Sequence, residues 1–343
     1  GTGAEALAEL RGLLKGFPFA TAADESAALA GILTAACRPS LPTAPAFLVT
    51  ASDFAAGKTH MAKLICAFAG GATPRGWPRR AEEQVKTLAA SYRSGSSAIL
   101  FDNLREGSAW HHEELALILT GGPAYEFRLL GVHELAPTST QAVLVVTGVN
   151  IRPAEDLIRR TIPVRLDPRC ERPGDRTFAF DPLAVVERQP GRWRMVALKV
   201  LSDFLQGGGA TDPKNLASFT EWSRIVRGAL LHHGLPDPVL TQKAAVDHDD
   251  ERDLLGRVLE LWQEAFRDEP LSARQVVVAC STGGATLTAL RFALEEVASE
   301  RGAINLRLLG AWLRSQAGRI VDRRRLVKVG KSREGATWAV VSV

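Results

Sequence analysis

Short apolar segments that alternate with stretches of helical spacing constrain the fold of this 343-residue chain more than any other feature. Three of them are residues 46–50, 98–101 and 142–146, and a fourth, residues 162–166, closes the region. Strands that alternate with helices are typical of a parallel sheet covered by helices. We therefore predict an α/β fold for the first half of the chain.

The second half of the chain has a different character. After Arg172 the apolar residues recur at helical spacing, and one helix is predicted over residues 192–206. Another is predicted to start at Ser218, in a Ser-x-x-Glu capping box, and to stop near Gly234. The tail is predicted to form three helices followed by a two-stranded hairpin within residues 326–341.

The composition excludes several classes of protein. Apolar residues make up 46% of the chain and charged residues 23%, which is typical of a folded protein and not of a disordered one. No apolar run reaches the roughly 18 residues of a membrane span, and the N-terminus lacks the pattern of a signal peptide. We therefore expect a cytoplasmic protein with no membrane partner. The cysteines form no C-x-x-C pair, so neither a zinc site nor a disulfide framework is expected. They are Cys37, Cys66, Cys170 and Cys280.

The net charge of +4 is distributed unevenly along the chain. Residues 271–343 include twelve Lys and Arg against five Asp and Glu, which leaves the rest of the chain mildly acidic. A basic C-terminal quarter on an acidic body indicates a polyanionic partner, and a solvated basic surface is the alternative.

Residues 52–59, Ser-Asp-Phe-Ala-Ala-Gly-Lys-Thr, match the phosphate-loop pattern G-x-x-x-x-G-K-[ST] except that Ser52 replaces the first Gly. In such a loop the backbone N–H groups hold phosphate oxygens, the Lys reaches the outer phosphates and the hydroxyl holds Mg²⁺. Lys58 and Thr59 fit these roles, and a chance Gly-Lys-Thr at a helix start is the alternative. The residues predicted to contact the nucleotide are Ala55, Ala56, Gly57, Lys58, Thr59 and His60.

An acidic residue supports the same interpretation. The apolar residues 98–101 end at Asp102, which follows Lys58 by 44 positions. A carboxylate at the end of a buried strand is suited to hold the water shell of Mg²⁺ beside a phosphate loop. We therefore predict a site for a nucleoside triphosphate and Mg²⁺, in which Thr59 and Asp102 hold the metal, Asp102 through water.

Taken in order, these motifs resemble those of the AAA+ ATPases. The similarity is to the replicative helicase-like domains of primase–helicase proteins from prophages and mobile elements, a group similar to superfamily 3 and minichromosome maintenance helicases. It extends over nearly the whole chain. The segments that carry it are residues 33–45, the phosphate loop, Phe101-Asp102-Asn103, Thr147-Gly148-Val149-Asn150, and residues 156–161, 171–178 and 218–227.

The resemblance implies roles for several residues. It implies that the phosphate loop and Asp102 bind ATP and Mg²⁺, and that Asn150 is a sensor that positions water or the γ-phosphate. It also implies that Arg159 or Arg160 is an arginine finger, which enters a neighbouring subunit and stabilises charge in the transition state. Such a site is complete only in a ring, so a homo-hexamer is implied. A solvated helix end is the alternative for the two arginines.

Two residues depart from the pattern of AAA+ proteins. Val149 stands where a first Asn is expected, which leaves Asn150 as the sensor with Thr147 behind it. Asn103 follows Asp102 where many AAA+ proteins have a Glu, and an amide orients water but accepts no proton. The general base is therefore left open among three acidic residues, which are Glu106, Glu113 and Glu114.

Two segments are predicted to contact DNA, and the first is a hairpin-like stretch within residues 125–140. In ring helicases of the resembled group, a hairpin just before the sensor enters the pore and grips a single strand. Arg128 and His133 are the residues predicted to do so. A surface charge and a turn residue are the alternative interpretations.

The second segment is the C-terminal module, which we interpret as a winged helix that binds duplex DNA. Asn305 is predicted to cap a helix whose apolar face is Leu306, Leu309 and Leu313, and Gly318 is predicted to end it. A basic hairpin follows, which suits a duplex, and protein contacts are the alternative use. The residues predicted to bind DNA are Arg307, Arg314, Arg323, Arg324, Arg325, Lys331 and Arg333.

We therefore predict an α/β protein with an AAA+ phosphate-loop core, a helical lid and a C-terminal winged-helix domain. The expected function is ATP-dependent DNA unwinding in replication of a phage or mobile element, with a primase or other replication proteins as partners. A DNA-stimulated ATPase that loads a partner, and a nucleotide-switched DNA-binding regulator, are the alternatives. The predicted segments are 1–45 (N-terminal helices), 46–168 (core), 169–250 (lid) and 251–343 (winged helix).

Overall fold

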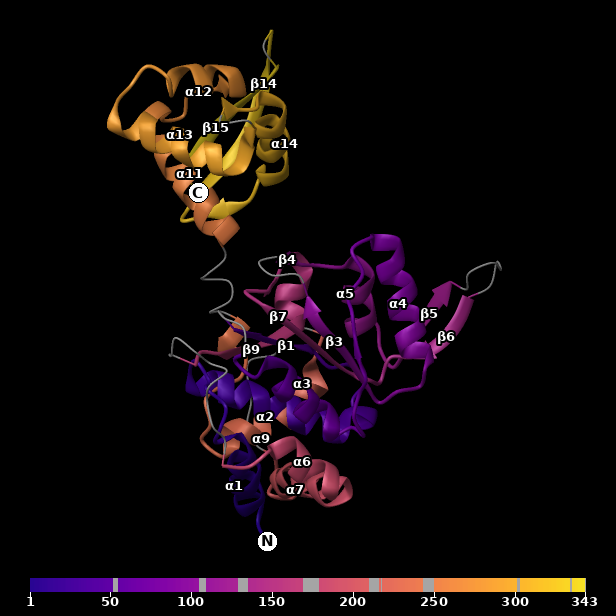
Figure 1. The fold of residues 1–343 in the computed structure, drawn as a ribbon. Coiled ribbons are helices and arrows are strands. Elements are labelled where there is room, and N and C mark those ends of the chain that lie inside the picture. Colours follow the sequence, from indigo (N-terminus) through magenta and orange to yellow (C-terminus); the bar gives the residue numbers. More distant parts are fainter. Residues whose placement is uncertain are drawn as a thin grey trace. The chain divides into compact units, whose positions relative to one another are not determined.

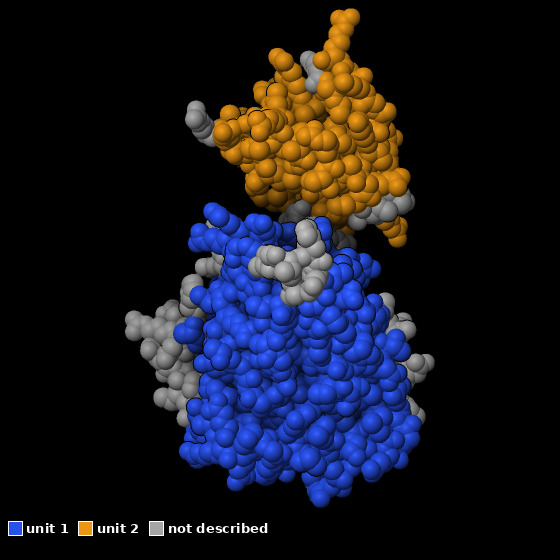
Figure 2. Space-filling view, turned by 90° about the vertical axis from the view of Figure 1, so that its right-hand side faces the viewer, with its two compact units in different colours: residues 1–247 blue, residues 248–343 orange. Residues whose placement is uncertain are grey.

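The computed structural model of residues 1–343 divides into two compact units, residues 1–247 and residues 248–343, which Figure 2 colours separately. The structure describes residues 1–51, 55–104, 109–128, 135–168, 179–209, 216, 218–242, 250–300, 303–333 and 335–342.

The centre of the first unit is a five-stranded parallel sheet with the strand order β2-β3-β7-β1-β9. The interior strands are almost wholly apolar, as expected of parallel strands that are buried on both faces. β9 lies at an edge of the sheet, and an edge strand tolerates Pro163 because one side of it needs no N–H donor. The predicted α/β architecture is confirmed. The strands are β1 (Ala46–Ala51), β2 (Pro74–Arg75), β3 (Ala98–Leu104), β7 (Val143–Val149) and β9 (Thr161–Leu166).

Local sequence signals explain where the first helices begin. Thr2 and Thr21 each start a helix with a capping box, in which the Thr and the acidic third residue bind one another's N–H groups. The third helix packs on β1, β3 and β7. The fourth was not predicted, because its sequence is mostly polar and it buries few residues. These helices are α1 (Gly3–Leu14), α2 (Ala22–Cys37), α3 (Lys58–Ala67), α4 (Ala81–Arg93) and α5 (Glu113–Thr120), with a 3-10 turn at Arg38–Ser40.

The helices that follow β9 share one hydrophobic core with α1, α2 and the sheet. Trp222 is fully buried, and its indole N–H donates to Thr34 of α2 at 2.8 Å. The predicted capping box at Ser218 is wrong. Ser218 has a left-handed backbone (φ 73°), its carbonyl accepts from Thr43, and the helix begins at Thr220 without a side-chain cap. These helices are α6 (Pro182–Arg188), α7 (Pro190–Gln206), α8 (Thr220–Trp222), a π-helical turn (Ser223–Arg227) and α9 (Gly228–His232).

The predicted hairpin is formed by the antiparallel strands β5 and β6, which project from the first unit beside α4 (Figure 1). Phe127 is buried at its base, where it stacks on Tyr92 of α4 at 6.2 Å and meets Tyr125 edge-on at 4.8 Å. Residues 129–134 lie outside the described residues. The short elements of this region are β4 (Ala109–Trp110), β5 (Ala124–Arg128), β6 (Leu135–Ser139), β8 (Arg152–Pro153) and the 3-10 helix η2 (Glu155–Arg160).

The second unit has its own hydrophobic core, between four helices and an antiparallel sheet in the order β10-β15-β14-β13. Trp262 and Trp338 are buried in it. Its described residues form four helices, where three were predicted. The helices are α11 (Asp250–Phe266), α12 (Ala273–Ala279), α13 (Ala285–Ala298) and α14 (Leu306–Gln316). The strands are β10 (Leu271–Ser272), β11 (Ser299–Glu300), β12 (Ala303–Ile304), β13 (Ile320–Val321), β14 (Arg324–Ser332) and β15 (Gly335–Ser342).

The predicted start of α14 is confirmed. Asn305 accepts the N–H groups of Arg307 and Leu308 and so satisfies the first turn of the helix. The predicted apolar face is wrong at Leu306, which is exposed, while Leu309 and Leu313 are buried.

Among the described residues, no helix is both long and apolar enough to cross a membrane. Cys37, Cys66 and Cys280 are free, buried thiols, and Cys170 lies outside the described residues. Burial raises the pKa of Cys66 to about 12, so this thiol stays protonated and packs as a small apolar group.

Candidate functional site

The segments predicted to bind the nucleotide meet at one edge of the parallel sheet. β3, β7 and β1 are parallel neighbours, so their carboxyl ends lie side by side. β7 lies between the other two, although it comes last of the three in the sequence. In open α/β sheets, ligands bind in the crevice outside the carboxyl ends of the strands, where the strand order reverses. The start of α3, Asp102 and Asn150 are all brought to this edge.

The chain enters α3 through two left-handed residues, Ala55 (φ 58°) and Gly57 (φ 94°). Gly57 directly precedes the helix, and no side chain of the described residues caps the helix there. An uncapped helix start directs N–H groups and the positive end of the helix dipole outward, which favours a phosphate. Gly suits this position because only a residue without Cβ adopts φ +94° without strain. Residues 52–54, which include Ser52, lie outside the described residues.

The first residues of α3 contact segments far away in the sequence. Lys58 is nearly buried, with 9% of its surface exposed. His60 Nε2 lies 3.0 Å from Oδ1 of Asp181, which also accepts the first N–H groups of α6. The His60 ring lies 6.0 Å from the ring of Phe17. Sequence reasoning missed Phe17 and Asp181, because only the folded chain brings them to the phosphate loop.

Thr59 and Asp102 are joined directly. The Thr59 hydroxyl donates a hydrogen bond of 2.8 Å to Oδ1 of Asp102, although the residues are 43 positions apart. A hydroxyl and a carboxylate are hard oxygen ligands of the kind that Mg²⁺ prefers. No group of three or more His, Cys, Asp or Glu among the described residues could hold a metal by itself. The residues present therefore fit a Mg²⁺ that takes its remaining ligands from phosphate and water, as in nucleotide sites.

Two asparagines at this edge have left-handed backbones, Asn103 (φ 58°) and Asn150 (φ 51°). Asn is one of the few residues that tolerate this conformation, and residues held in it cluster at functional sites. The N–H of Asn150 donates to the carbonyl of Ala51 at 3.0 Å, which fixes it beside the end of β1. Asn103 is exposed.

The acidic residues considered as general base have different surroundings. Glu114 accepts a hydrogen bond of 3.0 Å from the Tyr125 hydroxyl, so its carboxylate is attached to the β5–β6 hairpin. Burial and this bond raise the pKa of Tyr125 to about 12. Glu113 is exposed in the first turn of α5, and Glu106 lies outside the described residues. No hydrogen bond within the described part of the chain brings Glu113 or Glu114 to Asp102.

Arg159 and Arg160 end η2 and differ in accessibility. The Arg159 side chain is 80% exposed and lies 3.3 Å from Asp156. The Arg160 side chain is 21% exposed, and its guanidinium binds both the carboxylate and the carbonyl oxygen of Asp156. Gln242 holds the backbone here by donating to the carbonyl oxygens of Arg159 and Thr161. Of the two arginines, Arg159 has the side chain that a neighbouring molecule can reach.

Arg128 and His133 were predicted to contact DNA in the first unit. The side chain of Arg128 and the whole of His133 lie outside the described part of the chain. Only the base of their hairpin is described.

In the second unit, two of the predicted basic residues take part in packing. Arg324 Nε donates to Gln263 at 2.9 Å, and Arg325 is half-buried. Asp322 and Arg323 form the left-handed turn that joins β13 to β14. The predicted residues that are exposed are Arg307, Arg314, Arg323, Lys331 and Arg333.

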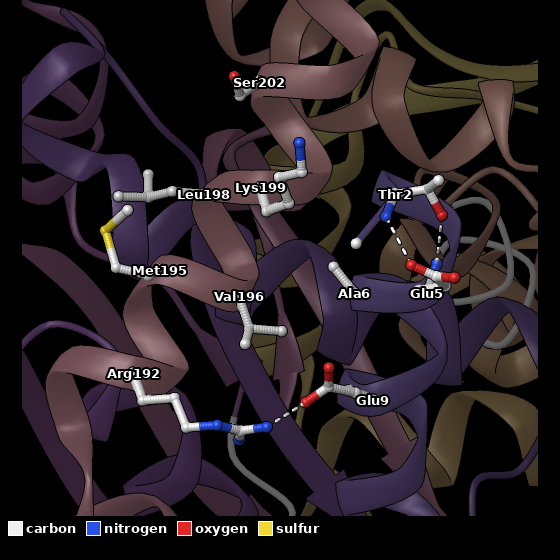
Figure 3. Close-up of a pocket in the computed structure, with 11 residues that line it drawn as sticks. Thr2, Glu5, Ala6, Glu9, Arg192, Met195, Val196, Leu198, Lys199 and Ser202 are labelled. Atoms are coloured by element: carbon white, nitrogen blue, oxygen red, sulfur yellow. Dashed lines mark hydrogen bonds and ion pairs between the residues drawn. The ribbon is translucent and has the colours of Figure 1, made fainter.

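A groove of about 480 Å³ lies between α1 and α7 of the first unit (Figure 3). Arg192 of α7 reaches across it to Glu9 of α1 at 2.5 Å. Met195 and Val196 of α7 line it. None of the predicted site residues lines this groove, so it is separate from the carboxyl edge of the sheet.

No family model and no curated protein matches this sequence. The chain is a mixed α/β protein whose five-stranded parallel sheet has a Gly-Lys-Thr segment and Asp102 of β3 at its carboxyl edge.

Proposed function

We propose that this chain is an AAA+ ATPase that unwinds DNA during replication of a phage or mobile genetic element, working as a homo-hexameric ring. The observation that carries the proposal is the 2.8 Å hydrogen bond between Thr59 and Asp102. It joins the residue after Gly-Lys to an acid near the carboxyl end of β3, on which α3 packs. A triphosphate with Mg²⁺ requires these two oxygen ligands close together at a helix N-terminus.

Each residue at the edge of the sheet has a part in the proposed hydrolysis. The metal, when bound, supplies positive charge that neutralises the phosphate oxygens. Lys58 binds the outer phosphates, and the N–H groups at the start of α3 hold the phosphate nearest the helix. Thr59 and Asp102 would hold this metal, Asp102 through water. Asn150 and Asn103 orient the attacking water with their amide groups.

The ring is proposed because Arg159 is exposed while Arg160 is held by its own helix. An exposed guanidinium on the first unit is suited to enter the site of the next subunit, where it would stabilise charge in the transition state. An arginine supplied in this way accelerates hydrolysis by about 10³- to 10⁵-fold.

Two described features support DNA as the partner. The base of the β5–β6 hairpin is anchored to α4 by the stacked rings of Phe127 and Tyr92. An anchored hairpin would follow movements of the ATPase core, as a hairpin that pulls a DNA strand must do. The second unit combines a capped helix, α14, with the long β14–β15 hairpin, and both bear exposed basic residues. A helix beside a basic hairpin is the arrangement of a winged helix on duplex DNA.

The proposal is tested by ATP hydrolysis and by strand displacement on forked DNA. Lys58→Ala should abolish ATP binding, and Asp102→Ala should abolish hydrolysis while the fold is retained. Lys63→Ala, on the same helix, is the matched control and should hydrolyse ATP as the wild type does. Wild-type turnover in Lys58→Ala or Asp102→Ala would refute the site.

Asn103 favours a second candidate function, a nucleotide-switched DNA-binding regulator with negligible turnover, because an amide cannot take the proton of the attacking water. Phosphate release measured with and without DNA distinguishes this regulator from an ATPase. A DNA-stimulated ATPase that loads a partner is distinguished by hydrolysis without strand displacement.

A further inference from the structure

Strands β3 and β7 leave their regular pairing at the edge where the proposed site lies. The pairing is regular up to Phe101 and resumes at Leu104 after a shift of register. Two residues of β3, Asp102 and Asn103, therefore stand opposite a single residue of β7, Thr147. Two residues opposite one is a β-bulge, and bulges beside functional sites re-aim the side chains that they carry.

One hydroxyl binds both residues of this bulge. Thr147 Oγ1 donates to Oδ1 of Asp102 at 2.5 Å and accepts the N–H of Asn103 at 2.9 Å. Thr147 is only 1% exposed, and the other residues of β7 are also buried. A buried hydroxyl on an apolar strand is costly unless it is hydrogen-bonded, and here both of its bonds go to the bulge.

The hydrogen bond from Thr147 also restricts the orientation of the Asp102 carboxylate. Its Oδ1 accepts from two hydroxyls, those of Thr147 and Thr59, which come from β7 and α3. Two donors on one oxygen fix the rotation of the carboxylate, and Oδ2 makes no hydrogen bond within the described part of the chain. The N–H of Asn103 is fixed at the same time, which supports the left-handed backbone (φ 58°) of that residue.

We propose that Thr147 is a positioning residue of the ATPase site: it holds the bulge so that Asp102 faces metal-bound water and Asn103 faces the attacking water. This inference rests on the proposed function. It assigns a role to a residue that touches neither nucleotide nor metal and acts through its two neighbours on β3. Outer partners of this kind typically change metal affinity or activity by about 10- to 100-fold when they are removed.

The test compares Thr147→Val, which removes the hydroxyl at similar volume, with Thr147→Ser, which keeps it. Thr147→Val should bind ATP without Mg²⁺ within about threefold of the wild type, since the phosphate loop is intact. Added Mg²⁺ should strengthen ATP binding at least about 10-fold less than it does in the wild type, so the KM for ATP with Mg²⁺ should rise. The kcat should fall by about 10- to 100-fold. Thr147→Ser should restore both values to within about threefold of the wild type.

Thr161→Val is the matched control, because the Thr161 hydroxyl is buried in the same sheet and has no hydrogen-bond partner among the described residues. It should leave the Mg²⁺ effect and kcat unchanged. Circular dichroism establishes that each variant is folded. If Thr147→Val does not fold, the inference is tested with Thr147→Ser alone. A Thr147→Ser protein whose kcat is as low as that of Lys58→Ala would overturn the inference.

A Thr147→Val protein with the wild-type kcat and the wild-type Mg²⁺ effect would overturn the inference and leave the proposed function standing. Failure of the proposed function has a different signature, because the wild-type chain itself would then neither bind nor hydrolyse ATP. That result would overturn both.

Discussion

The carboxylate of Asp24 is completely buried and joins the start of α2 to strand β9 through Arg165. It accepts the N–H and the hydroxyl of Thr21, and it also accepts the backbone N–H and the guanidinium of Arg165. Asp24→Ala should lower the free energy of unfolding by about 3 kcal/mol, because breaking a buried pair leaves an uncompensated charge. Urea denaturation measures this change.

Glu25 is the matched control for that prediction, since it is the next residue of the same helix and also pairs with an arginine. Its partner Arg11 is half exposed, and pairs at the surface contribute about 0–1 kcal/mol. Glu25→Ala should therefore lower the free energy of unfolding by less than about 1 kcal/mol. If Asp24→Ala and Glu25→Ala lowered the free energy of unfolding equally, burial of the ion pair would not determine its contribution to stability.

Arg159→Ala should leave the melting temperature and ATP affinity near the wild-type values, because the side chain is 80% exposed. The kcat for ATP should fall by about 10³-fold if the guanidinium serves a neighbouring subunit. Arg160→Ala should instead lower the melting temperature, since it removes the bonds to Asp156. Steady-state phosphate release and thermal melts measure the two effects.

Mixed rings give the sharper form of this experiment. Arg159→Ala and Lys58→Ala subunits are each expected to be inactive alone. At some interfaces of a mixture, an intact Lys58 meets an intact Arg159 from the neighbour, so part of the activity should return. A mixture that stays inactive at every ratio would contradict a shared site.

His112 makes part of the stability dependent on pH. Its Nδ1 accepts the N–H of Leu115 at 3.1 Å, which requires this nitrogen to be unprotonated. Burial lowers the pKa of His112 from 6.5, while Glu114 acts in the opposite direction and His111 lowers it further. Because the folded pKa is below the unfolded one, the stabilisation is complete above about pH 6.5 and is lost as the pH falls through the folded pKa.

His112→Asn tests this, because an amide oxygen caps the helix at any pH. Between about pH 7.5 and about pH 5.5, the wild type should lose more stability than the variant in urea denaturation. Parallel curves for the two proteins would contradict a neutral histidine cap.

The exposed basic residues of the second unit should contribute to DNA binding through phosphates. Changing Arg323, Lys331 and Arg333 to Glu should weaken binding of duplex DNA and flatten its salt dependence. Each lost phosphate contact reduces the slope of log K against log salt by about 0.9. Arg257→Gln is the control, because that guanidinium already lies 2.8 Å from Glu296. Unchanged affinity at several salt concentrations would remove the hairpin from the interface.

The elements that could be predicted from the sequence are those defined by local signals. The strand at 98–101 is a short run of buried residues, and α14 starts at an Asn that caps its own helix. The wrong predictions involve distant contacts: the carbonyl of Ser218 accepts from Thr43, and this tertiary bond replaces the expected cap. Thr147 is similar, because its partners are determined by a bulge that exists only once β3 and β7 are paired.

Strand β1 is synthesised well before either of its neighbours in the sheet. It ends at Ala51, whereas its partners β7 and β9 begin at Val143 and Thr161. Until these partners have been synthesised, the backbone N–H and C=O groups on both sides of the apolar strand β1 are unpaired. Unpaired strands of this kind are prone to aggregation. Fragments truncated before β7 should therefore be insoluble, and the nascent chain has to be shielded until β7 and β9 have emerged.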